Sequence, residues 1–284
     1  MKVKKRGMLG IIFRRLLKRK TAVFGLITFA FMIGVAIFAD LIAPSGPNEM
    51  FDNMQYRPPC VAHPMGTDML GRDILSRIIY GSRVSVSVGI ISMIAASLIG
   101  IPIGIISGYY RRWIDQLIMR IVDIMLAFPV FLLAIMIMVV LSPSASNVAV
   151  ALTIVYIPRY ARLVRGVVLS IRENEYIEAA KALGIRPWRI FLYHILPNCI
   201  APVMVLVTLS VGVAIIAEAS LSFLGMGTQP PTPSWGSDLR EALTTMELNP
   251  WLAFFPGLAI LLTVLGINML GDGLRDAIDP RLKQ

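Results

Sequence analysis

The segment EYIEAAKALGIRPWRIFLYHILP, residues 175–197, is polar and partly charged and lies between two long apolar runs. Tyr176 to Leu183 has the composition of a short helix, with acids in the first turns, where the helix dipole favours negative charge. Gly184 fits the position where a left-handed residue ends a helix, and Pro187 suits the first turn of a second one. We expect the second helix to close at Pro197. The sequence therefore predicts two short helices joined by a glycine corner.

Composition alone permits an ordinary amphipathic loop between two membrane spans here. However, EAAKALG followed at this distance by Leu196 and Pro197 resembles the EAA loop of ABC importer permeases. The family pattern has Ile where this chain has His194. The resemblance implies a short cytoplasmic coupling helix that sits in a cleft of a separate ATPase subunit. The residues that it assigns to ATPase coupling are Glu175, Tyr176, Glu178, Ala179, Ala180, Leu183 and Gly184.

The composition is that of a polytopic membrane protein. The 284 residues are 56% hydrophobic and only 15% charged, with a mean hydropathy of +0.73, which excludes an ordinary soluble globule. The net charge of +10 lies in the flanks of apolar runs, without a basic surface interleaved with aromatic residues. We therefore interpret the charge as a topology signal and expect no nucleic-acid partner.

Apolar runs and their flanks divide the chain into five parts. Residues 1–20 carry nine Lys or Arg and no acid, and the 19 residues of 21–39 carry no charge. A signal peptide shares this pattern, but the run exceeds the usual length, so we expect an uncleaved first helix. The parts are a basic cytoplasmic N-terminal segment (1–20), a first span (21–43), an extracytoplasmic segment (44–83), a five-span permease core (84–272) that includes the coupling loop (169–197), and a cytoplasmic tail (273–284).

One uncharged stretch of the core is too long for a single membrane crossing. The stretch 124–158 has 35 uncharged residues, more than one crossing requires, and the polar run 142–147 supplies a break. We expect the core spans at 84–110, 115–141, 148–168, 200–217 and 248–271. The predicted fold class is therefore an all-α polytopic membrane protein with six transmembrane helices; the resemblance further implies the type I ABC importer permease fold.

The basic residues predict the orientation. With both termini in the cytoplasm, 22 of the 27 Lys and Arg residues lie on the cytoplasmic side. Such asymmetry is typical of the positive-inside rule. The coupling loop is then cytoplasmic, and the resemblance implies a multi-pass protein of the prokaryotic plasma (inner) membrane.

The string GTDMLGRDILSR, residues 66–77, lies in the extracytoplasmic segment. Thr67 or Asp68 is expected to cap the following turn, and Asp73 is expected to pair with Arg77 four residues on. Structurally, a short surface helix would suffice. The string nevertheless resembles the extracytoplasmic signature of the peptide and nickel branch of these permeases, as do SFLGMG, QPPTPSWG and NMLGDGLRDAIDPRL. The signature residues are Gly66, Thr67, Asp68, Gly71, Arg72 and Asp73.

Small residues recur every four positions within 84–110, at Ala96, Gly100, Gly104 and Gly108. They form one smooth face where another backbone can pack closely. We favour packing within the subunit over a subunit interface.

Isolated charged residues near the span ends have two interpretations each. For Glu218, we expect an acid at the water interface, and the alternative is a proton relay. For Arg159, Arg162 and Arg165, we expect snorkelling to lipid headgroups, and a gate or an ATPase contact is the alternative. Cys60 and Cys199 lie on opposite sides of the predicted membrane, so we expect no disulfide between them.

The chain contains no GxxxxGK[ST] phosphate loop. We therefore expect no cofactor and no catalytic site here, with ATP and magnesium held by partner subunits. The resemblance implies one half of a permease heterodimer. Its partners would be a homologous second permease subunit, two cytosolic ABC ATPase subunits, an extracytoplasmic solute-binding protein and membrane lipid.

Other classes fit less well. A secondary transporter would need a mid-membrane site, often between inverted repeats, and no span carries a central charge. An intramembrane serine protease needs a His deep in a span, whereas His63 and His194 lie outside the spans. In a passive channel, the two short cytoplasmic helices would have no role. Peptides are the expected substrates, with glutathione, nickel or metal chelates as the alternatives.

Overall fold

The computed structural model of the chain describes residues 15–247 and 249–278. Most of the predicted N-terminal segment and the last six residues of the tail lie outside this part. Within this part, the secondary structure is helical, and the β-structure consists of two isolated β-bridges. The helices are α2 (Lys20–Ile37), α3 (Ala39–Ile42), α4 (Ile74–Tyr110), α5 (Arg112–Ala127), α6 (Val130–Leu141), α7 (Ala145–Arg172), α8 (Glu175–Ala182), α9 (Pro187–Ile190), the π-helical segment Phe191–Ile195, α10 (Leu196–Phe223), α11 (Trp235–Ala242) and α12 (Trp251–Ile278).

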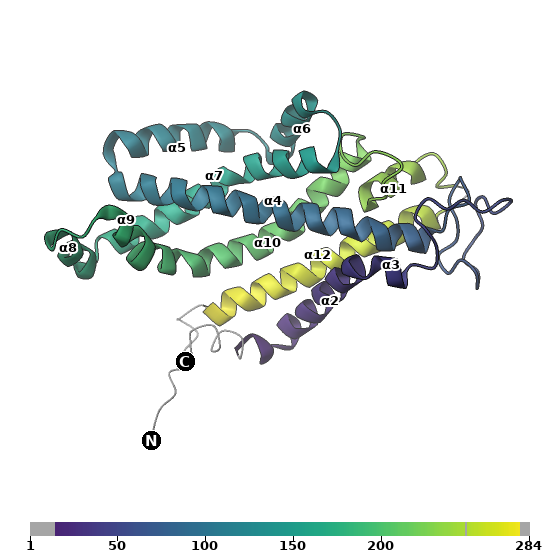
Figure 1. Cartoon of the computed structure of the whole chain (residues 1–284), viewed down its shortest axis with the longest axis horizontal. Helices are drawn as coiled ribbons and strands as arrows, with labels where there is room; N and C mark the ends of the chain where they lie inside the picture. The colour runs from purple at the N-terminus through teal and green to yellow at the C-terminus, as the bar shows by residue number, and fades with distance from the viewer. Residues whose placement is uncertain (1–14, 248, 279–284) are drawn as a thin grey trace, which may run out of the picture.

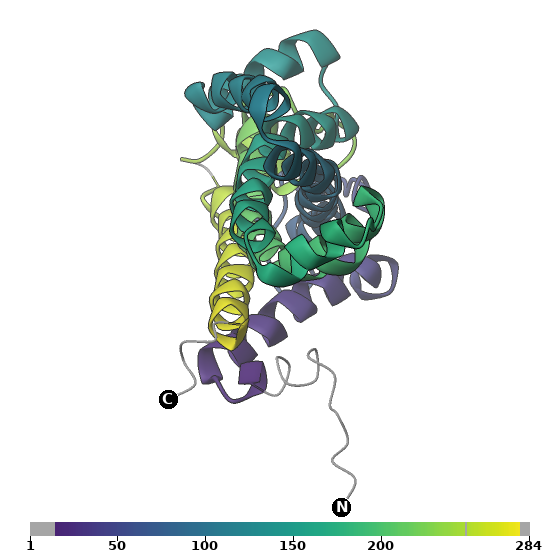
Figure 2. The ribbon, with the colours of Figure 1, turned by 90° about the vertical axis from the view of Figure 1, so that its left-hand side faces the viewer.

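The long helices run side by side along the longest axis of the molecule (Figure 1). One end carries α8 and α9, and the other carries α3 and α11; we call them the α8 end and the α11 end. Helices α2 and α12 form a pair at one side of the bundle, which Figure 2 shows from the α8 end. The functional motifs of the sequence therefore gather at opposite ends.

Four helices of the described part are long and apolar enough to cross a membrane: Lys20–Ile37, Ile74–Tyr110, Pro187–Phe223 and Trp251–Ile278. The pair α5 and α6 makes a fifth if it counts as one bent span. Helix α7 has 28 residues, enough for a crossing, but carries several arginines. The all-α membrane fold is confirmed, whereas the full count of six spans stays a prediction.

The expected span over 115–141 is broken into two helices. Helix α5 ends at Ala127, α6 begins at Val130, and the two are bent by 95°. Phe128, which precedes Pro129, is extended, with φ −86° and ψ 139°. A proline ring disfavours helical backbone at the residue before it, so the helix ends there although the apolar sequence continues.

Helix α4 packs on α7 through the small-residue face. A Cβ atom added at Gly100 would lie 2.6 Å from the Cβ of Tyr160. At Gly104 it would lie 2.5 Å from the carbonyl oxygen of Ala161. Gly108 is similarly close to α7, and Ala96 is fully buried. The structure thus places this face against another helix of the same chain, where the two backbones come close.

Helices α2 and α12 also meet through glycines. A Cβ atom at Gly25 would lie 2.6 Å from the carbonyl oxygen of Gly266. Near the start of α2, Arg19 forms an ion pair with Asp276 of α12. The first span therefore packs mainly against the last span of the chain.

Substitution of Gly104 by Ala tests the α4 and α7 contact. The new methyl group would overlap backbone that cannot rotate away, so we expect a loss of about 1–3 kcal/mol in stability. Thermal unfolding of the purified chain in detergent measures this loss. Gly166→Ala is the matched control, because no atom lies within 4 Å of a Cβ there. Equal unfolding temperatures for the two variants would contradict the close packing.

Candidate functional site

The α8 end contains the predicted glycine corner. Gly184 follows α8 with φ +73°, a conformation that favours glycine. The Gly184 N–H donates to the carbonyl of Lys181 at 3.0 Å, and the Ile185 N–H donates to that of Ala180 at 3.1 Å. These bonds satisfy carbonyls that the end of a helix leaves free.

One face of α8 is buried and the others are open. Ile177 and Ala180 are the buried residues of α8. The remaining residues that sequence reasoning assigned to coupling are exposed: Glu175, Tyr176, Glu178, Ala179, Leu183 and Gly184. Helix α8 therefore packs on the rest of the chain through one side and leaves its other side exposed.

The end of α4 supports α8. The ammonium nitrogen of Lys181 lies 5.4 Å from the ring centroid of Tyr109. Arg172, at the end of α7, donates to the Tyr109 carbonyl at 2.7 Å. The ring of Phe191 packs edge-on against that of Tyr109, with centroids 4.7 Å apart. Partial burial lowers the pKa of Lys181, and nearby Arg172 acts in the same direction. Sequence reasoning missed Tyr109 as the residue on which these contacts meet.

Large apolar side chains are exposed along the same segment. Leu183 is 81% exposed, and Tyr193 is 70% exposed. Half-exposed apolar side chains accompany them at Tyr176, Trp188 and Leu192. Exposed apolar surface of this kind is typical of a contact with another protein or with a membrane surface.

The expected end of the second helix at Pro197 is wrong. Helix α9 continues through the π-helical segment into α10, and Pro197 lies in the first turn of α10. There the missing proline N–H is tolerated. The side-chain amide of Asn198 donates to the carbonyl of His194 at 2.7 Å, which satisfies an acceptor in the wider turn. The chain can therefore pass from the short helix into the span without a break.

At the α11 end, the signature string forms tight buried turns rather than a surface helix. Gly66 and Gly71 have φ values of +82° and +76°. A Cβ atom at Gly71 would lie 2.5 Å from the carbonyl oxygen of Phe51, so a larger residue would not fit. The other four signature residues are buried: Thr67, Asp68, Arg72 and Asp73.

Asp68 caps the turn that follows it, as expected, since its Oδ1 accepts from the N–H groups of Leu70 and Arg72. Asp73 caps α4: its Oδ2 accepts from the backbone N–H and from the hydroxyl of Ser76, both at 2.8 Å, and its Oδ1 lies 3.0 Å from His63 Nδ1. The expected pair of Asp73 with Arg77 is wrong, because Ser76 and His63 occupy the carboxylate of Asp73.

Arg72 and Arg77 reach across to α11. Arg72 Nη2 donates to Glu241 Oε2 at 2.6 Å, and Arg77 Nε donates to Asp238 Oδ1 at 3.1 Å. Burial raises the pKa of Asp238 to about 6, against the opposing effect of the Arg77 guanidinium. The indole N–H of Trp235 adds a bond to the Ile78 carbonyl at 3.0 Å. The signature thus fixes the start of α4 to a segment some 160 positions away, which sequence reasoning missed.

Three further charged residues differ from expectation. Arg165, expected to snorkel, forms a two-pronged ion pair with Asp115 of α5, at 2.6 and 2.7 Å, and Arg162 pairs with Asp123. These two arginines therefore form ion pairs with acidic residues of the same chain instead of extending to lipid headgroups. Glu218, expected at the water interface, has 0% of its surface exposed, so that expectation is wrong.

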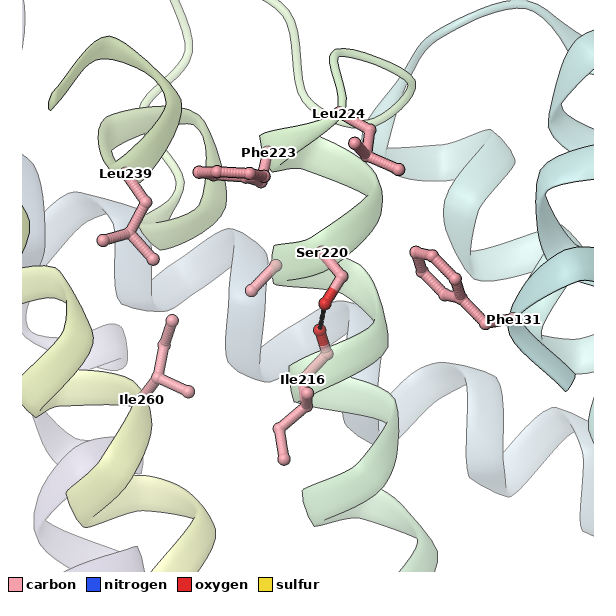
Figure 3. A pocket seen from close by; sticks show the side chains of 8 residues that line it. Phe131, Ile216, Ser220, Phe223, Leu224, Leu239 and Ile260 are labelled. Carbon is pink, nitrogen blue, oxygen red and sulfur yellow. Dashed lines mark hydrogen bonds between the residues drawn. The ribbon is translucent and has the colours of Figure 1, made fainter. Parts of the chain in front are cut away.

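A groove of about 370 Å³ opens beside the last turns of α10, near the α11 end (Figure 3). Phe131 of α6 lies on one side, and Leu239 of α11 and Ile260 of α12 lie on the other. Ser220 also lines it, but its hydroxyl donates to the Ile216 carbonyl at 2.8 Å. The groove is therefore an apolar surface without a free polar group among its lining side chains.

Two family models match the chain. Residues 100–284 match the binding-protein-dependent transport system inner membrane component, and residues 7–59 match the N-terminal TM domain of oligopeptide transport permease C. The chain is 49% identical to the dipeptide transport system permease protein DppC of Alkalihalophilus pseudofirmus, over 95% of this chain and 89% of that protein. It is 45% identical to the glutathione transport system permease protein GsiD of Pectobacterium atrosepticum, over 95% and 90%.

Among solved structures, the chain is similar to a chain of the MetNI methionine ABC transporter in an inward-facing conformation. The TM-score is 0.60 at 19% identity, over 72% of this chain and 98% of that chain. At this identity the likeness supports the fold alone, which is that of an ABC importer permease.

Removing one partner of the buried Arg77–Asp238 ion pair tests whether this pair stabilises the α11 end. Asp238→Asn removes the nearest acid from the buried guanidinium of Arg77 and leaves Asp68 and Glu241, each at 3.9 Å, so we expect a loss of about 3 kcal/mol in stability. Thermal unfolding in detergent measures it. Asp40→Asn, in the exposed pair with Arg83, is the control and should change little. A small effect at both positions would contradict a structural role for the network.

Proposed function

The chain belongs to the family of binding-protein-dependent transport system inner membrane components, and from this premise we propose that it is the permease subunit of an ATP-driven importer of peptides. The observation that carries the proposal is the position of α8, a short helix at one extremity of the molecule that rests on the ends of α4 and α7 and has most of its motif residues exposed. Such a projection is suited to receiving force from a separate protein.

In this proposal the exposed side of α8 docks into a cytosolic ATPase subunit. Glu175, Glu178 and Leu183 face the partner, while Ile177 and Ala180 hold the helix to its own chain. When the ATPase subunits close on ATP and magnesium, α8 moves with them. Its contacts with Tyr109 transmit the motion to α4, and the bundle alternates between two openings. ATP hydrolysis is assigned to the partners, and this chain contributes no catalytic group.

The chain is a multi-pass membrane protein, and we assign its α8 end to the cytoplasm and its α11 end to the outer side of the plasma (inner) membrane. The α8 end carries Arg111, Arg172, Lys181, Arg186 and Arg189, in agreement with the positive-inside rule. Helix α2 begins and α12 ends toward that end (Figure 1), which supports cytoplasmic termini. The signature turns then face an extracytoplasmic solute-binding protein, and a homologous permease subunit completes the path.

The substrate assignment rests on the relatives. One carries a name for dipeptide transport and the other a name for glutathione transport. Glutathione is itself a tripeptide, so a short peptide is the chemistry shared by both.

Charge reversal on α8 tests the coupling role. Glu178→Arg should abolish uptake by the reconstituted complex without preventing membrane insertion, because it alters the docking face and leaves the buried side intact. Uptake of radiolabelled peptide into proteoliposomes is the measurement. Glu247→Arg, an exposed acid at the α11 end, makes the same charge change and should keep uptake. Full uptake by the Glu178 variant would refute the assignment.

Copurification separates the proposal from a secondary transporter or a channel. The tagged full chain should bring down ATPase subunits from native membranes, and Gly184→Pro should weaken that recovery, since a proline ring cannot adopt φ +73°. Absence of any ATPase with the wild-type chain would count against an ABC permease.

Calorimetry on the partner solute-binding protein tests the substrate. We expect dipeptides or oligopeptides to bind. Tight binding of glutathione alone, or of a nickel chelate with no peptide binding, would overturn the general peptide assignment.

A further inference from the structure

The carboxyl group of Glu218 is fully buried. It lies near the α11 end of α10, with 0% of its surface exposed. Its Oε1 accepts from the hydroxyl of Ser222, one turn on, at 2.8 Å. Its Oε2 has no hydrogen-bond partner within residues 15–247 and 249–278. A fully ionised carboxylate in such a place would be costly, because bulk water does not reach its charge.

Hydroxyl groups from three elements face this carboxyl. Ser85 comes from α4, Ser222 from α10 itself, and Ser234 from the residue before α11. All three serines are buried. The Thr228 N–H donates to the Ser222 hydroxyl at 3.0 Å, so the loop before α11 joins the same cluster. We call these side chains, with Glu218, the Glu218 cluster.

The arginines that these elements carry at this end lie against other groups. Arg77 of α4 is bound to Asp238 of α11. Arg83 of α4 is bound to Asp40. Arg240 of α11 lies against Gly225. Among the described residues, Glu218 takes part in no ion pair.

The packing around the cluster is tight. A Cβ atom at Gly236 of α11 would overlap the backbone of Ala219, and one at Gly227 would overlap the Ser222 hydroxyl. Two glycines are thus needed for the α11 segment to approach α10. A proton needs no additional space, whereas a sodium ion needs room for several oxygen ligands around it.

We propose that Glu218 is a proton-binding site: in this conformation it holds a proton, and the neutral carboxyl joins α10 to α4 and to the α11 segment. A protonated carboxyl has an O–H donor as well as an acceptor oxygen, so it can donate to one hydroxyl of the cluster and accept from another. Loss of the proton leaves a bare charge among neutral groups and loosens this end of α10.

Infrared spectroscopy tests the protonation directly. The difference spectrum of the purified full chain minus its Glu218→Gln variant, at neutral pH, should contain the carbonyl band of one protonated carboxylic acid. Glu247→Gln, which removes an exposed acid, is the matched control and should remove carboxylate bands instead. Carboxylate bands in the Glu218 difference spectrum would overturn the proposal.

Thermal unfolding gives a second, independent readout. A carboxyl that keeps its proton in the folded state and releases it on unfolding stabilises the fold at low pH and loses that contribution as the pH rises. The wild type should therefore unfold at progressively lower temperature, relative to Glu218→Gln, as the pH rises above the ordinary range of Glu.

Sodium is tested in the same assay by exchanging sodium chloride for potassium chloride. If the difference in unfolding temperature between wild type and Glu218→Gln did not change with pH, the proton-binding site would be contradicted. A rise in the unfolding temperature of the wild type alone on adding sodium would contradict it as well. Neither measurement uses transport, so the outcome is separate from that of the proposed function.

Discussion

The close approach of α4 and α7 along the glycine face holds the two ends of the molecule in a fixed relation. Because the glycines of α4 carry no side chain, α7 packs directly on the backbone of α4, and the two helices cannot slide without steric overlap, so they behave as one rigid unit. Helix α8 begins only two residues after α7 ends, at Glu175, and rests on Tyr109 in the last turn of α4. The projecting helix is therefore attached to both members of the pair.

The same rigid pair extends to the opposite end. Helix α4 has 37 residues, which corresponds to about 55 Å at the usual rise per residue. It starts within the buried signature turns, where Arg77 binds Asp238 of α11. Buried ion pairs are weak evidence for stability, but their demand for correct geometry fixes the position of α11 relative to α4. A displacement at α8 can thus reach the α11 end through one continuous helix.

Local rules predicted the features that depend on local sequence. The glycine corner at Gly184 and the small-residue face of α4 follow from backbone conformation and helical period, and the structure contains both. The partner of Arg77 could not be found in this way, since Asp238 is 161 positions distant. The break before Pro129 was hidden because hydropathy counts apolar residues and does not register the steric effect of a proline ring on the residue before it. For Glu218, nearness to the end of a span suggested water, whereas packing against α4 and the segment before α11 buries it.

Helices α5 and α6 are the least covered part of the bundle. In α5, Val122 is the buried residue, and in α6 these are Ala134 and Met138. Val139 and Val140 are 70% and 83% exposed. A surface so apolar is stable only against lipid or another membrane helix, and small residues, which favour close helix contact, are few on it. The groove beside Phe131 opens next to this surface. In the proposed complex, the homologous permease subunit would cover this surface and complete the wall of the path.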